Sequence, residues 1–150
     1  MTFRLLLAVG ALAVVAAAAV PAQAAAPAQH RVALSGTFKN VGSNGNVFKD
    51  EGTLKGSPFG SAKIAITLTI QPQGVATETF RITTTKGTVR GTANGTYTVN
   101  GTDIALAGKA VFTGGTGTYK GIKATNLRFT AGDTIPPSGG PLTLKGTATF

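Results

Sequence analysis

Apolar and polar residues alternate along most of the chain after residue 31, which is the pattern of strands with one buried face. The clearest run places Ile64, Ile66, Leu68 and Ile70 on one face, with Lys63, Thr67 and Thr69 opposite. Similar runs lie at 32–38, 48–54, 80–82, 89–93, 97–99, 104–112, 127–129 and 142–150. None of them has helical periodicity, so the pattern predicts an all-β domain.

Turn-forming sequences separate these runs and set the number of strands. They occur at 41–46, 56–60, 71–74, 94–95, 100–101 and 133–140, where Gly, Asn, Pro and Ser gather. Such short connections favour antiparallel hairpins, and we expect roughly seven to nine strands, with eight preferred. The recurring Gly-Thr pairs have no fixed period, which argues against a solenoid. The predicted fold is a closed eight-stranded antiparallel β-barrel, which side chains fill or which holds one small ligand.

Alternation by itself leaves open which face of the barrel is inside. A membrane barrel has its apolar face outward, flanked by aromatic girdles. Here the apolar face is interspersed with Gly and Ala, which suit a cramped interior, and the chain has two Tyr and no Trp. We therefore expect a soluble barrel that does not insert stably into a membrane.

The first residues resemble a secretory signal peptide. Residues 1–4 carry one positive charge, an apolar run follows at 5–20, and small residues then allow cleavage after Ala24 or Ala26. This predicts a signal peptide at 1–24, a flexible linker at 25–30 and one β-barrel domain at 31–150, secreted to the periplasm or the exterior. The chain has no cysteine, so packing and backbone pairing must hold the domain together.

The charge balance is strongly basic, with Lys+Arg 14 against Asp+Glu 5. In the sequence these cations sit singly, and neither a basic stripe nor stacking aromatics accompany them, so nucleic acid is not the expected partner. A solvated basic surface is the simpler interpretation. Attachment to an anionic polymer of the cell envelope stays open as an alternative.

The stretch "FTGGTGTYKGIK", 112–123, is glycine-rich and contains lysine, but it has neither the spacing nor the following helix of a nucleotide-binding loop. With the residues after it, "GGTGTYKGIKATNLRF" resembles the "GGTG-x-[FY]-x-x-[AV]-[KR]-G" segment of the allene oxide cyclase and dirigent superfamily. The resemblance implies an eight-stranded barrel with a central cavity, and it allows a trimer. It assigns the segment to a corner between two late strands, with Tyr119 as a plug and the bend made by Gly114, Gly115, Gly117 and Gly121. Ala124 departs from the pattern, which usually has Gly there.

Catalytic members of that superfamily bind an apolar or phenolic molecule in the barrel and steer its cyclisation or coupling. The aspartate that dirigent members carry on the first strand has no counterpart in "RVALSGTFKN", and the water-binding residues of the cyclases have no match either. The first hypothesis is therefore a non-catalytic secreted barrel that binds a small apolar or phenolic molecule. Its cavity would be lined by Ile66, Leu68, Phe80, Ile82, Leu106 and Phe112.

An isomerase or cyclase is the alternative hypothesis, and it would depend on carboxylates inside the barrel. Asp50 shares the phase of Phe48, and Glu78 shares that of Phe80, so both are candidates for inward-facing acids. The simpler alternative places both at strand ends in water. His30 is the only histidine and there is no cysteine, so we expect no cofactor and no metal site of the ordinary zinc, copper or iron–sulfur kind.

Overall fold

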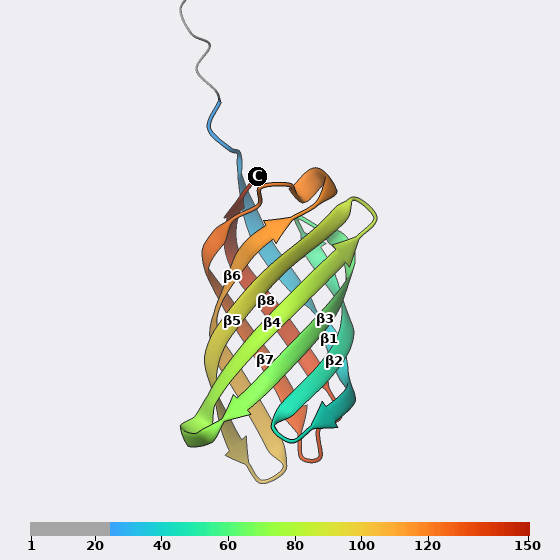
Figure 1. Cartoon of the computed structure of the whole chain (residues 1–150), viewed down its shortest axis with the longest axis vertical. Coiled ribbons are helices and arrows are strands. Elements are labelled where there is room, and N and C mark those ends of the chain that lie inside the picture. Colours follow the sequence, from blue (N-terminus) through green and yellow to red (C-terminus); the bar gives the residue numbers. More distant parts are fainter. Residues whose placement is uncertain (1–24) are drawn as a thin grey trace, which may run out of the picture.

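The structure is a computed structural model, and it describes residues 25–150; the predicted signal peptide lies outside the described residues. Eight antiparallel strands follow one another around a closed barrel, and the last pairs with the first (Figure 1). They are β1 (Gln29–Asn44), β2 (Val47–Ser57), β3 (Gly60–Gln71), β4 (Val75–Thr84), β5 (Gly87–Asn100), β6 (Asp103–Gly115), β7 (Ala124–Thr134) and β8 (Gly140–Thr149). The predicted fold class is confirmed.

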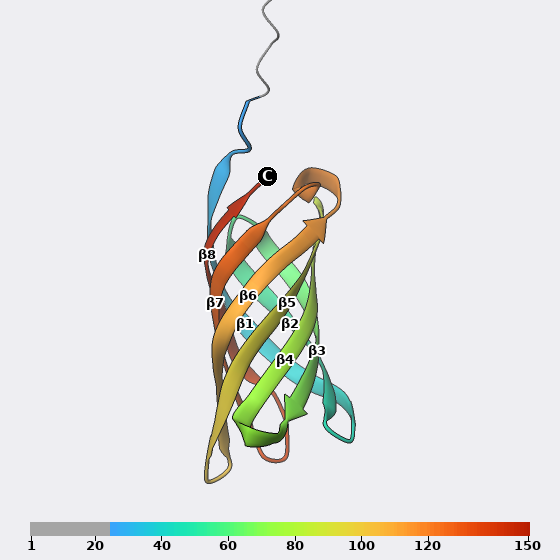
Figure 2. The same cartoon turned by 60° about the vertical axis from the view of Figure 1, so that its left-hand side comes forward.

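Most connections are short hairpins, as the turn signals predicted. Two contain single 3-10 turns, η1 (Pro72–Gly74) and η2 (Gly117–Tyr119). The N-terminal segment and the C-terminus lie at the same end of the barrel as η2 (Figures 1 and 2). We call this the η2 end; the opposite end carries the β1–β2, β3–β4, β5–β6 and β7–β8 connections.

One predicted turn is wrong, and one turn was missed. Asn94 and Gly95 lie within the continuous strand β5, not in a turn. A side chain at position 95 would meet the Ala107 carbonyl oxygen, 2.3 Å from an ideal Cβ, so this glycine serves strand packing. The missed turn joins β4 to β5, where the Thr84 hydroxyl accepts from the Lys86 amide at 3.0 Å. It lacks the Asn or Pro that marks the other turns.

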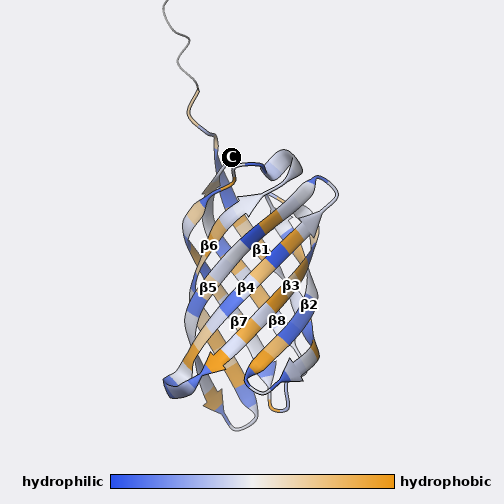
Figure 3. Ribbon diagram, viewed as in Figure 1, coloured by the Kyte–Doolittle hydropathy of each residue, from blue (hydrophilic) through white to orange (hydrophobic). Residues whose placement is uncertain are grey.

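The apolar face of every strand points into the barrel, which decides the orientation that alternation left open. One continuous core fills the interior, with Ile82, Val89, Ile122 and Leu127 at 0% exposure. Hydrophilic and hydrophobic residues alternate along the strands in Figure 3, and Lys, Arg and Thr occupy the outer wall. Burial of this core is the main favourable term in a domain without disulfides.

An aromatic cluster closes the η2 end of the barrel. The Tyr119 ring, 2% exposed, meets Phe59 edge-on at 4.9 Å and Phe150 at 5.6 Å between ring centroids. The glycine-rich segment leads from β6 through η2 to β7. It forms a corner in which Tyr119 packs against the core. His30 stacks on Phe150 at 4.1 Å and belongs to β1, which begins inside the segment expected to be a linker.

Several inward glycines mark places where two strands approach so closely that no side chain fits. An ideal Cβ on Gly36 would lie 1.8 Å from the Thr53 carbonyl oxygen, and one on Gly52 would lie 2.2 Å from that of Thr37. Gly36 lies opposite Leu54, and Gly52 lies opposite Phe38, so the two glycines stand diagonally across the β1–β2 pair. The strong curvature of a narrow barrel therefore depends on them.

Replacing Gly36 by alanine should destabilise the barrel by about 2 kcal/mol or more, because the new methyl group must push back the β2 backbone. Gly42→Ala is the matched control, since a Cβ there meets nothing within 4 Å and the residue lies on the same strand. Urea denaturation of both variants measures the difference in unfolding free energy. Equal stability of the two variants would show that the strands can separate without cost.

Candidate functional site

Both carboxylates singled out by their strand phase lie on inward-facing positions. Asp50, on β2, is 3% exposed, and Glu78, on β4, is partly buried. Their strands are separated only by β3, on which Ile66 lies opposite Asp50 and Leu68 lies opposite Glu78. The structure thus brings the two acids into one half of the barrel, away from the η2 end.

Asp50 is held by a bulge on the neighbouring strand. The side-chain amide of Asn40 donates to Asp50 Oδ1 at 3.0 Å, and the same amide faces the carbonyl oxygens of Gly42 and Lys49 at 3.3 Å. The pairing of β1 with β2 shifts register between Asn40 and Gly42, which leaves Val41 bulged outward. Burial raises the pKa of Asp50, the Asn40 hydrogen bond lowers it, and the charge of Asp133 raises it further.

Glu78 faces the apolar interior and has the most displaced pKa of these groups. Burial and then the nearby charge of Asp50 raise the pKa of Glu78 to about 7. Its side chain lines a cavity of about 20 Å³ together with Ile66, Phe80 and Phe129. A volume of this size holds about one water molecule. Near pH 7 this carboxyl is therefore about half protonated inside the barrel.

The six residues predicted to line a ligand cavity all belong to the buried core. Their exposed fractions run from 0% at Ile82 to 9% at Leu68. Ile66 and Phe80 border the small cavity, and the rings of Phe80 and Phe112 meet edge-on at 6.2 Å between centroids. Small-molecule sites typically have about 300–1,000 Å³. A ligand in this interior would need core side chains to move, and ligand binding there stays a prediction.

Asp133, the third carboxylate in this region, has a structural role. Its Oδ1 accepts from the backbone N–H groups of Thr134, Ser138 and Gly139 at 2.7, 2.9 and 2.7 Å. These bonds fix the β7–β8 connection. The backbone carbonyl of Ser138 in turn accepts from the backbone N–H of Asn40 at 3.4 Å. Asp133 therefore orders the β7–β8 connection, and the Ser138 carbonyl joins that connection to β1.

Neither a metal site nor a membrane helix emerges from residues 25–150. No group of three or more His, Cys, Asp or Glu side chains in this part of the chain is arranged to hold a metal ion. Within the same residues, no helix has the length and hydropathy that a membrane span requires.

The outer wall carries the feature that sequence reasoning missed. Lys109 on β6 lies directly opposite Arg128 on β7, which lies directly opposite Lys145 on β8. All three are exposed, and we call them the cationic ladder. In the sequence they stand nearly twenty residues apart, so only the strand register, fixed by the turns, could have revealed them.

No carboxylate accompanies the ladder among its neighbours on the wall. Asn94 and Ala33 continue the row at either end. The flanking outward positions on the three strands are Ala107, Val111, Asn126, Thr130, Thr143 and Thr147. Like charges directly opposite each other destabilise a sheet, so the bare ladder costs stability that a bound anion would restore.

No protein-family model matches the chain, and no curated protein or solved structure is significantly similar to it.

Replacing Glu78 by glutamine should flatten the dependence of stability on pH. The folded protein holds the Glu78 proton more tightly than the unfolded chain does, because burial raises the pKa from 4.5 to about 7. Its stabilising effect is therefore complete below pH 4.5 and is lost as the pH rises through 7, by about 2 kcal/mol between pH 5 and 8. Glu51→Gln, on the outer wall, is the control.

Urea denaturation of the three proteins at both pH values makes the comparison. The wild type and Glu51→Gln should lose stability toward pH 8, and Glu78→Gln should lose much less. A Glu78→Gln variant as pH-dependent as the wild type would show that this carboxyl is fully hydrated.

Proposed function

We propose that this protein is an exported, non-catalytic β-barrel that binds a linear anionic polymer of the cell envelope on its outer wall. The observation that carries the proposal is the cationic ladder, in which Lys109, Arg128 and Lys145 stand in register with no carboxylate among their neighbours. Export is supported by the signal-like order of residues 1–24.

The charge of the whole wall supports the same function. Each of the eight strands carries at least one exposed Lys or Arg, whereas Asp50 and Glu78 face inward and Asp133 is bound by loop amides. Of the five carboxylates, only Glu51 and Asp103 are exposed. A positive wall of this kind raises the local concentration of polyanions and releases their counterions on binding.

A linear polymer suits the ladder better than a small anion does. Adjacent strands lie about 4.8 Å apart, so the three Cα atoms span about 10 Å in a straight line across the sheet. A small anion would contact one or two of these groups, whereas a polymer with closely spaced charges meets all three. Nucleic acid is disfavoured because no aromatic residue within 25–150 is exposed to stack on bases.

A small apolar or phenolic molecule inside the barrel is the second candidate function. Glu78 favours it, since a carboxyl beside an apolar cavity offers a hydrogen bond to the polar end of such a molecule. The resemblance to the allene oxide cyclase and dirigent superfamily points the same way and also keeps the isomerase alternative. The cavity of about 20 Å³ makes this candidate depend on movement of Phe80 and its neighbours.

Replacing all three ladder residues by glutamine should weaken polymer binding by at least about tenfold, because it removes three phosphate- or carboxylate-binding charges. Lys39, Lys63 and Lys86, which lie on β1, on β3 and in the β4–β5 turn, give a control triple variant with the same net charge. Retention on immobilised poly(glycerol phosphate) and polyglutamate at two salt concentrations makes the comparison.

The ladder variant should also show a shallower loss of affinity with salt than the control does, since fewer counterions are released. Equal losses in the two triple variants would mean that total charge, and not the ladder, governs binding. Failure of the wild type to bind either polymer would contradict the proposed function.

A further inference from the structure

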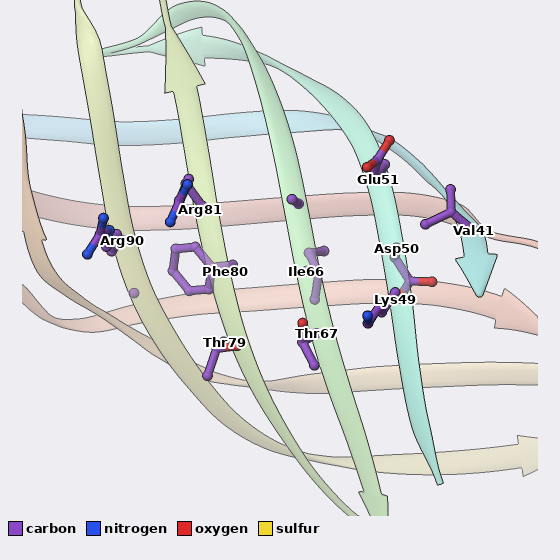
Figure 4. A pocket seen from close by; sticks show the side chains of 12 residues that line it. Val41, Lys49, Asp50, Glu51, Ile66, Thr67, Thr79, Phe80, Arg81 and Arg90 are labelled. Atoms are coloured by element: carbon purple, nitrogen blue, oxygen red, sulfur yellow. The ribbon is translucent and has the colours of Figure 1, made fainter. Parts of the chain in front are cut away.

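A pair of arginines lies on the wall separately from the ladder. Arg81 on β4 is directly opposite Arg90 on β5, and both are exposed. The same row continues to Ala65 on β3 and to Gly114 on β6. Figure 4 shows the two arginines side by side, with Glu51 two strands away. Both row neighbours are short, so no long side chain lies directly opposite the guanidinium pair on either side.

The wall is hollowed on both sides of Arg90. A groove of about 480 Å³ borders the pair and includes Thr67 and Thr79 (Figure 4). A second hollow, of about 360 Å³, lies on the other side of Arg90 and is lined by Thr88 and Thr116. Arg90 thus borders both spaces and Arg81 borders the first. The Thr88 and Thr116 hydroxyls are hydrogen-bonded to each other at 2.8 Å. The two guanidinium groups and the hydroxyls in the larger groove are therefore the main donors for an anion.

A β-bulge sets the direction of Arg90. The register of β5 against β6 shifts between Arg90 and Gly91, and Thr113 is the extra residue on β6. The Thr113 hydroxyl donates to the Arg90 carbonyl at 3.3 Å. Bulges re-aim side chains and are common beside functional sites. This one places Arg90 between the two hollows.

No carboxylate lies directly opposite either arginine, although Glu51 also lines the larger groove. Glu51 is the exposed acid of the same row, but it lies directly opposite Lys39 on the other side of Ala65. Two strand spacings, about 10 Å at the backbone, separate it from Arg81. Two guanidinium groups in direct register repel each other, and an oxyanion between them removes that repulsion.

We propose that Arg81 and Arg90 form a phosphate-binding subsite, so that the polymer bound by the wall is one that carries phosphate groups. This inference rests on the proposed function and names its ligand class. Two planar guanidinium forks with adjacent hydroxyls match the several oxygens of a tetrahedral phosphate, whereas one carboxylate is satisfied by a single fork.

One polymer strand can meet both features. Arg90 lies four residues along β5 from Asn94, which is directly opposite Lys109 of the ladder. Four strand residues span about 13 Å, within reach of two or three repeats of a phosphodiester polymer. In this arrangement the ladder supplies general attraction, and the arginine pair distinguishes phosphate from carboxylate.

The test is the double variant Arg81→Lys with Arg90→Lys, which keeps both charges and removes both forks. Binding to poly(glycerol phosphate) should fall at least about tenfold, while binding to polyglutamate should change less than about threefold. Arg31→Lys, an exposed change on β1, is the control and should alter neither. Equal losses for the two polymers, or no loss for either, overturn the subsite.

A second measurement separates failure of the subsite from failure of the proposed function. In NMR titrations with inorganic phosphate alone, the backbone amides of Thr79 and Thr92, which lie opposite each other beside the pair, should shift and saturate. Acetate at the same concentration should not reproduce this, and the double variant should weaken it. Saturable shifts without polymer binding would remove the proposed function and keep the subsite; their absence would remove the subsite even if polymer binds.

Discussion

The structure depends on bringing eight strands so close together that their backbones touch where glycines face each other. Gly95 and Gly108 mark such a contact, with ideal Cβ atoms 2.3 and 2.2 Å from the opposing carbonyl oxygens. Gly36 and Gly52 mark a second close approach, where each glycine lies opposite a core side chain of the other strand. A barrel this narrow leaves room inside for apolar side chains and little else. It needs no disulfide, because closure pairs every strand on both edges and buries one continuous core.

The same closure separates the charges of the chain. A strand side chain can face only the core or the wall, so each charged residue is assigned to one side by its phase. The Lys and Arg residues of the strands fall on the wall, while Asp50 and Glu78 fall inside, where burial raises the pKa of each. On the wall, the only exposed carboxylates of the strands are therefore Glu51 and Asp103, whereas every strand carries an exposed Lys or Arg. This division places positive charge on the wall and acids with raised pKa values in the interior.

The sequence predicted the fold because its signals were local. Alternation identified the strands, turn residues identified most hairpins, and the glycine-rich segment identified the corner at η2. The Asn94-Gly95 dipeptide led to a wrong turn prediction, because glycine is also required where two strands approach closely. Here the close neighbour is the Ala107 backbone of β6, which is distant in the sequence. The candidate acids were found through their phase, but the way Asn40 holds Asp50 depends on a bulge that no local pattern announces. The cationic ladder was not predicted, because it arises from the register between strands and not from a local sequence pattern.

The strand register brings cations that are far apart in the sequence into one row. Lys109, Arg128 and Lys145 would no longer form a row on the wall if any one of their strands slipped by one residue, since a slip moves a side chain to the other face. Here bulges and tight turns fix the pairing, so the repulsion within each row cannot be relieved by moving the strands. It can be relieved by an anion. If the ladder binds a polyanion as proposed, the free-energy cost of gathering its three cations is already met by folding and not by binding.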